Sequence, residues 1–214
     1  MVLLQNFTFI EKGGCMKYLL VSFIVSLLVL SSCSTNRVFT KGEYTDPDRV
    51  ILLDDRFNDS DMKILADYLV KSLEDSSVIK TEKQAPIVQV ETVTNSTSEH
   101  IDMQALTDKV RAALIKTGKI AFHDKQQRAT LTEEYDYQNN SGNVSKETAK
   151  KKGSQIGSDY IMTGNFTSIV QEVGDKKVVF YKLTLNLTNI KTGLISWSDE
   201  KEIKKLYKKR SVSM

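Results

Sequence analysis

The sequence predicts one α/β domain, in which a mixed sheet of four to five strands carries helices mainly on one face. Apolar residues recur at helical spacing over residues 62–73, and Asp102 and Gly118 bound a second helical segment. A long segment, Val178–Ile190, alternates apolar with polar side chains. Such alternation gives a strand one buried and one solvated face, typical of antiparallel pairing with helices on one side.

The first helix and the first strands are expected between residues 50 and 93. Val50–Leu53 is a brief apolar run that could form a strand. Asp59 or Ser60 is the expected N-cap of the first helix. Pro86 precedes a strand at Ile87–Val93. The apolar residues of the helix lie at i, i+3, i+4, i+7 and i+11, namely Met62, Leu65, Ala66, Leu69 and Leu73.

The second helix has the clearest boundaries. Asp102 is its expected N-cap, Lys116 is its last residue, and Gly118 stands where a glycine commonly closes a helix. Thr94–Glu99 before it is a polar loop. A short strand at Lys119–His123 should follow the glycine.

Two more helices are expected before the sheet resumes. One starts after Asp124 and ends near Tyr135, and Tyr137–Val144 then forms a loop. The other runs from Ser145 to Ile156, ends at Gly157 and carries Glu147 in its first turn, where negative charge is favourable.

The last third of the domain is predicted to be a meander of strands. Asp159–Gln171, Val178–Ile190 and Leu194–Lys204 are the three segments, and Asn189–Gly193 is a hairpin turn that uses glycine for a positive φ. The buried face of the middle strand should carry Val179, Tyr181, Leu183, Leu185 and Leu187.

The N-terminal region predicts a lipid anchor. Lys17 precedes an apolar run of 13 residues, Tyr18–Leu30, which is too short to span a bilayer. The run ends in Leu30-Ser31-Ser32-Cys33, the pattern of a bacterial lipobox. Cleavage between Ser32 and Cys33 would free a cysteine that carries diacylglycerol and an acyl chain. The alternative is a simple N-terminal membrane helix with an incidental cysteine.

Residues 1–15 do not fit ahead of a signal peptide that has its own Met-Lys start. Lys12-Gly13-Gly14 can be encoded by a purine-rich, ribosome-binding sequence before the Met16 codon, so these residues are interpreted as a gene-calling artefact. The expected division is a signal peptide at 16–32, a lipidated N-terminus and tether at 33–49, a globular domain at 50–205 and a basic, frayed tail at 206–214.

Composition limits the compartment and the partners. Lys and Arg number 30 against 27 Asp and Glu, a formal net charge of +3. Nucleic acid is therefore not an expected partner, because it would need a stronger basic excess. Cys15 and Cys33 are the two cysteines, so no disulfide is expected in the exported domain. Ser34 favours the outer membrane, since Asp at that position favours inner-membrane retention in enteric bacteria.

No catalytic or metal-binding constellation stands out, so an enzyme is not predicted. His100 and His123 lack the spacing of metal ligands. Asp54-Asp55, Asp59 and Asp61 could hold a cation, but the last two suit a helix N-terminus and the calcium-loop spacing is absent.

Other conspicuous residues have ordinary explanations. Gly153–Gly164 lacks the spacing of a phosphate-binding loop. Glu133-Glu134 suits a solvated helix face, as do the basic runs Lys150–Lys152 and Lys204–Arg210, although these could touch anionic lipid or glycan. Trp197, the single tryptophan, is either a core residue or a half-exposed interface anchor.

Four segments, taken together, resemble the LpoB family, outer-membrane lipoproteins that activate penicillin-binding proteins. The resemblance covers about Val50 to Lys205, and part of it is shared with the TolB N-terminal domain and the curli secretion protein CsgG. The segments are Arg56–Met62, Ile87–Val93 with Asn95-Ser96-Thr97, Ser158–Gly164 and Gly193–Asp199.

The resemblance implies a TolB N-terminal-like fold and a non-catalytic regulator at the outer membrane, facing the periplasm. Its partner would be the accessory domain of a class A penicillin-binding protein, with peptidoglycan as a further candidate, and its binding would stimulate glycan polymerisation and crosslinking. Such a regulator needs a higher affinity for the active state of the synthase and no active site.

No short motif marks the partner-binding residues, so Cys33 is the one site residue that carries over. The tether is short and has the single proline Pro47, whereas enteric relatives carry a long proline-rich tether. The alternative function is a component of a CsgG-like secretion or envelope assembly system, which would need additional amphipathic hairpins for a membrane barrel.

Overall fold

The computed structural model describes residues 42–52, 54–82 and 84–209. The chain divides into two compact units, Met1–Asp46 and Pro47–Met214. In the first unit, the described residues 42–46 contain no helix or strand. Cys33 and the rest of the predicted signal peptide and lipobox lie outside the described residues.

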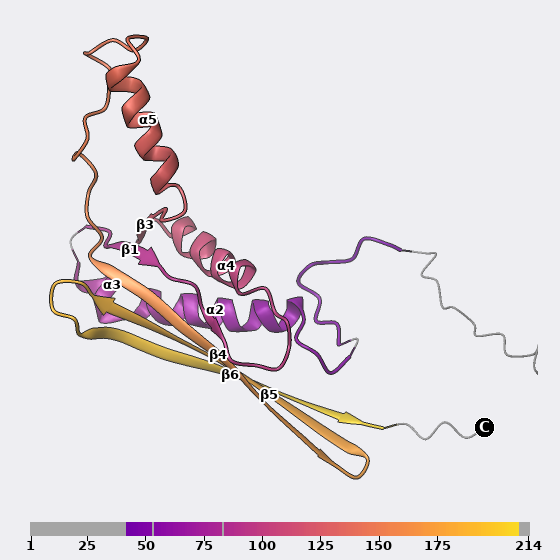
Figure 1. Ribbon diagram of the computed structural model, residues 1–214. Helices are drawn as coiled ribbons and strands as arrows, with labels where there is room; N and C mark the ends of the chain where they lie inside the picture. Colours follow the sequence, from indigo (N-terminus) through magenta and orange to yellow (C-terminus); the bar gives the residue numbers. More distant parts are fainter. Residues whose placement is uncertain (1–41, 53, 83, 210–214) are drawn as a thin grey trace, which may run out of the picture. The chain divides into compact units, whose positions relative to one another are not determined.

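The second unit is built on one mixed sheet, as the sequence predicts (Figure 1). β1 is parallel to β3 and β4, whereas β4, β5 and β6 pair antiparallel. Five strands in the order β3-β1-β4-β5-β6 form its path, and a short sixth strand, β2, pairs with β4. The strands are β1 Ile87–Val90, β2 Thr94–Asn95, β3 Ala121–His123, β4 Tyr160–Val173, β5 Lys176–Asn189 and β6 Ile195–Lys208.

Two long helices, α2 (Asp59–Asp75) and α4 (Met103–Lys116), contact each other and cover one face of the sheet. A short helix, α3 (Ser77–Thr81), follows α2 directly. A further helix, α5 (Arg128–Asn140), has no buried residue. The prediction of helices mainly on one face is therefore confirmed.

The caps of the two long helices follow the sequence closely. Asp102 caps α4 through its carboxylate, which accepts from the backbone of Gln104 and Ala105. Gly118 follows with φ of 67°. The predicted cap of α2 is one or two residues late: Asn58 is the N-cap and forms a capping box with Asp61.

The core lies between the helices and the covered face of β1, β4 and β5. Its strand contribution is the predicted alternation: Val179, Tyr181, Leu183, Leu185 and Leu187 are all buried. The intervening residues of β5 are only partly buried and face away from the helices. Among the described residues, helices therefore cover one face of the sheet and leave the other uncovered; the latter is called here the outer face.

One predicted helix is wrong. Residues 145–156 form a turn that begins at Ser145 and a second turn at Lys152-Gly153 but no helix, and none of them is buried. Only Ala149 and Ile156 are apolar in this stretch, so it has no apolar stripe to bury and helix propensity alone does not stabilise it. Consequently Gly157 closes no helix.

Some boundaries also differ from prediction. Residues 50–52 form no strand; the amide of Ile51 donates to the hydroxyl of Ser60 instead. α5 continues to Asn140, through the first part of the predicted loop. β6 continues to Lys208, past Lys204, so the first residues of the expected frayed tail belong to the sheet.

Candidate partner-binding surface

The outer face carries an apolar patch at one end. Strand register places Ile169 of β4 beside Phe180 of β5, and Val178 of β5 beside Leu206 of β6. Val173, at the end of β4, lies on the same face. We call these five residues the apolar patch; the exposed fractions of Ile169, Leu206 and Val173 are 57%, 60% and 78%. Within the part of the chain that the structure describes, no helix covers this face, so the patch is exposed there.

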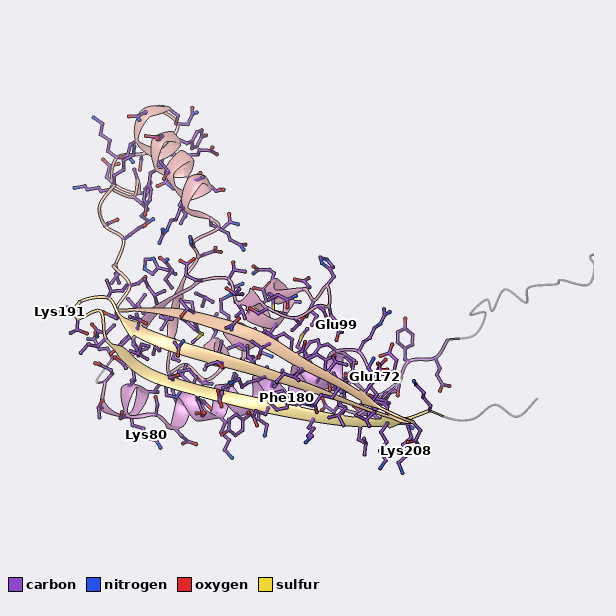
Figure 2. The ribbon with its side chains drawn as sticks, turned by 60° about the horizontal axis from the view of Figure 1, so that its bottom comes forward. Lys80, Glu99, Glu172, Phe180, Lys191 and Lys208 are labelled. Carbon is purple, nitrogen blue, oxygen red and sulfur yellow. The ribbon has the colours of Figure 1, made fainter. Side chains whose placement is uncertain are left out.

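Three lysines flank the apolar patch on the same face. Lys204 pairs in register with Phe180, and Lys176 lies directly opposite Lys208. Like charges in directly opposed positions destabilise a sheet. Among the described residues these lysines form no ion pair. Figure 2 shows Phe180 and Lys208 in the half of the sheet away from the Lys191 hairpin. This surface suits an anionic, partly apolar partner.

The backbone before α2 is fastened to the helix-side face of the same sheet end. Asp55 forms an ion pair with Lys177 of β5, and the Tyr207 hydroxyl of β6 donates to the carbonyl of Asp54. The hydrogen bond from Lys177 lowers the pKa of Asp55 below its ordinary value. The same contact, followed by one to Glu172, raises the pKa of Lys177.

A buried ion pair secures the start of α2. Lys205 Nζ lies 2.7 Å from Asp61 Oδ2, and the exposed fractions of the two side chains are 5% and 3%. Lys205 also donates to the carbonyl of Arg56 at 2.6 Å. The Asp61 carboxylate additionally accepts from the amide of Asn58. Both charged groups of this pair therefore have hydrogen-bond partners besides each other, which a buried ion pair needs to be stable.

Three aromatic rings also anchor residues 54–57 to the sheet. Phe57 packs edge-on against Phe166 and Tyr181, with ring centroids 5.0 and 5.5 Å apart. The Tyr181 hydroxyl donates to the carboxylate of Glu99, whose other oxygen accepts from the amide of Phe57. Burial, followed by the hydrogen bond to Glu99, raises the pKa of Tyr181.

The acidic residues singled out in the sequence do not form a cation site. Asp55 and Asp61 pair with lysines, and Asp59 and Asp61 lie in the first turn of α2, as their helix-terminal explanation predicts. The Asp54 side chain accepts from the amide of Arg56. Within the described ranges, no group of three or more His, Cys, Asp or Glu side chains is placed to hold a metal.

The other candidate residues are not brought together. His100 and Glu133-Glu134 are exposed, and His123 is partly buried at the end of β3. Trp197 is partly buried and packs against the core from β6. The basic run Lys150–Lys152 is exposed. None of the described helices is long and apolar enough to cross a membrane.

Sequence reasoning missed the apolar patch, although its signal was present. In the alternating segment of β5, Val178 and Phe180 occupy polar positions, so two apolar side chains stand on the solvated face. Their neighbours Ile169 and Leu206 come from other strands, and only strand register brings the four together. The buried role of Lys205 was also missed, since a lysine in a basic run predicts exposure.

A comparison with protein-family models matches residues 61–203 to the peptidoglycan-synthase activator LpoB. A search of curated protein sequences found no significant match.

Three solved structures illustrate the similarity of this chain to known proteins. The C-terminal domain of LpoB from Salmonella enterica is 17% identical, with 67% of this chain and 98% of that chain covered and a TM-score of 0.44. The NMR structure of Escherichia coli LpoB is 15% identical, with coverages of 83% and 87% and a TM-score of 0.41. Lipoprotein GNA1162 from Neisseria meningitidis is 12% identical, with coverages of 56% and 83% and a TM-score of 0.36.

Proposed function

This chain belongs to the LpoB family of peptidoglycan-synthase activators, and on that premise we propose that it is a non-catalytic regulator of a class A penicillin-binding protein. It binds an accessory domain of the synthase and stimulates glycan polymerisation and, with it, peptide crosslinking. The observation that carries the proposal is the family match over residues 61–203. A regulator works by binding the active state of its partner more tightly than the inactive state.

The apolar patch and its lysines are the proposed contact with the synthase. An apolar centre with a charged rim is the usual anatomy of a protein interface. Lys176 and Lys208 repel each other across the sheet, and a carboxylate of the partner placed between them would relieve that repulsion. The surface therefore selects a partner domain that has an acidic rim around an apolar centre.

Glycan polymerisation tests the activation. The full chain, purified in detergent, is added to the class A synthase of the same cell together with lipid-linked precursor, and strand synthesis is followed with time. We expect a clear increase in rate. L206E should lose most of it, because the charge would be buried in the apolar centre.

The matched control is L194E, which changes an exposed leucine at the opposite hairpin and should activate as wild type does. If folded wild-type chain leaves an active synthase unchanged, the activator function is wrong. If L206E activates fully, the function stands and the contact lies elsewhere.

Lipid attachment at Cys33 is the second part of the proposal, with cleavage between Ser32 and Cys33 and residence at the outer membrane, facing the periplasm. A thioether-linked diacylglycerol and an N-terminal acyl chain together give stable anchoring. C33A should therefore release the exported chain from the outer-membrane fraction, and the intact mass of wild type should show the added lipid. A chain of unchanged mass that stays in the membrane would contradict the anchor.

A further inference from the structure

A groove runs between α2 and the edge strand β6. Its strand wall contains Trp197, and its volume is about 560 Å³. Four of the other lining residues are spaced i, i+3, i+4 and i+7, so they share one side of α2, and the fifth is the C-cap residue that follows the helix. They are Tyr68, Lys71, Ser72, Asp75 and Ser76.

Contacts between the two walls hold the groove open in a defined form. The Lys201 ammonium lies 4.6 Å from the centroid of the Tyr68 ring. The Ser72 hydroxyl donates to the carboxylate of Asp199. Lys201, Asp199 and Trp197 alternate along the helix-side face of β6. The groove is thus preformed, which lowers the entropy lost on binding.

The walls combine aromatic surface with hydrogen-bonding groups. Trp197 is partly buried, and the exposed fraction of Tyr68 is 44%. Asp75 pairs with Lys80 at 3.1 Å, whereas Lys71 forms no ion pair within the described ranges. An indole or phenol ring offers an apolar face, and the lysine, serine and carboxylate groups beside it offer donors and acceptors.

This combination matches the chemistry of a sugar chain. Pyranose rings present apolar C–H faces to aromatic rings, and their hydroxyl groups both donate and accept. An acetamide group adds a carbonyl that accepts a hydrogen bond from Lys71 and an N–H that donates one to the Asp75 carboxylate. Because Lys71 and Asp75 have opposite charges, the groove does not demand a strongly charged ligand. Because it is open, it admits a continuous chain.

We propose that this groove binds a glycan chain of N-acetylated sugars, with Trp197 as its stacking platform. The inference is independent of the proposed synthase contact, since Trp197 and the apolar patch use opposite faces of β6. It would let the same domain hold the cell-wall polymer while the outer face engages a protein.

Intrinsic fluorescence gives a direct test, because Trp197 is the single tryptophan of the chain. The full chain in detergent is titrated with chitotetraose, a soluble β-1,4-linked oligomer of N-acetylglucosamine. We expect a saturable change in emission. Co-sedimentation with purified peptidoglycan sacculi is the second measurement, and it does not depend on the tryptophan signal.

Two variants connect binding to the groove. Y68A removes an aromatic wall and K71A removes the unpaired ammonium, and each should weaken binding ~2–10-fold. Y137A is the matched control, since Tyr137 is an exposed tyrosine on α5, 51% exposed. Circular dichroism verifies that the variants fold, and synthase activation without sacculi should be the same for all three variants as for wild type.

The proposal is overturned by any of three results. The first is no saturable change in emission and no co-sedimentation with sacculi. The second is equal glycan binding by wild type, Y68A and K71A. The third is a change in emission with a synthase peptide and none with chitotetraose, which would make the groove a protein contact.

Discussion

Gly164 is the residue at which a single methyl group should disturb the sheet most directly. A Cβ at this position of β4 would lie 2.6 Å from Leu185 Cδ2, 3.0 Å from the carbonyl oxygen of Thr184 and 3.1 Å from Val93 Cγ2. The backbone oxygen belongs to the neighbouring strand and cannot yield without altering the β4–β5 pairing. Glycine is thus required here by close approach, not by φ.

G164A should therefore lower the free energy of unfolding by ~1–3 kcal/mol, the usual cost of overpacking a core. Urea unfolding followed by circular dichroism measures it. G157A is the control, because a Cβ at Gly157 has no neighbour within 4 Å and should leave stability almost unchanged. If G164A and wild type are equally stable, the β4–β5 pair can accommodate a methyl group at this position without a loss of free energy, and the prediction is wrong.

The buried pair of Asp61 and Lys205 gives the second prediction at this scale. Replacing only one partner leaves the other charge buried and unpaired, so D61N and K205M should each destabilise the domain by ~3–5 kcal/mol. The double variant should cost less than the sum of the two single changes. K204M is the control, because Lys204 is an exposed lysine of the same strand and lies opposite Phe180. Additive losses in the double variant would show that the pair contributes no coupling.

At the scale of elements, the fastening of residues 54–57 to β5 and β6 predicts a dependence on pH. The pKa of Asp55 is lowered in the folded state by Lys177. The carboxylate of Asp55 therefore binds a proton more tightly in the unfolded chain than in the folded chain. The resulting stability is present above the ordinary pKa of Asp, about 3.9, and is lost as the pH falls below it. Asp48 and Glu91 have lowered pKa values for the same kind of reason, through Lys63 and Lys125.

D55N should therefore show a smaller loss of stability than wild type between pH 5 and pH 3, because it lacks the carboxylate that must be protonated. Urea midpoints at the two pH values measure this. D67N, on an exposed position of α2, should keep the full wild-type dependence. Identical pH dependence of D55N and wild type would show that the ion pair does not contribute to the fastening.

The elements also show what the sequence could and could not predict. α4 was predictable to the residue, because Asp102 and Gly118 are local signals whose chemistry ends a helix wherever they stand. The turn at Gly193, with φ of 70°, was predictable for the same reason. Residues 145–156 were mispredicted because a serine cap starts a helix that only tertiary packing can sustain.

The apolar patch could not be predicted from the sequence, because its residues come from strands that are far apart in the chain. Ile169, Phe180 and Leu206 are each unremarkable alone, and pairing of β4, β5 and β6 is needed to gather them. Likewise, the buried position of Lys205 follows from its contact with Asp61, 144 residues earlier in the chain. Local patterns predict caps and alternation, whereas sites made by strand register require the fold.

At the scale of the whole domain, β6 separates two surfaces of different chemistry. Leu206 contributes to the apolar patch on the outer face, whereas Trp197 lines the groove beside α2. A strand at the edge of a sheet is reached from both faces, so one element can present a protein contact and a polymer contact together. The two proposed activities should therefore be separable by mutation.

The lysines of the outer face give the prediction that belongs to this scale. The triple variant K176E/K204E/K208E reverses the charge beside the apolar patch, so it should bind the synthase more weakly, mainly through a slower association rate. Wild-type binding should also weaken as salt is raised from 0.05 to 0.3 M, because exposed charges are screened, and this dependence should be lost in the variant. Surface plasmon resonance with immobilised synthase measures both effects.

The matched control is K150E/K151E/K152E, which makes the same change in net charge at an exposed loop and should retain the salt dependence. If both triple variants weaken binding equally, net charge alone steers association and the outer face has no special part in it. If only the outer-face variant does so, the lysines beside the apolar patch steer the association with the synthase.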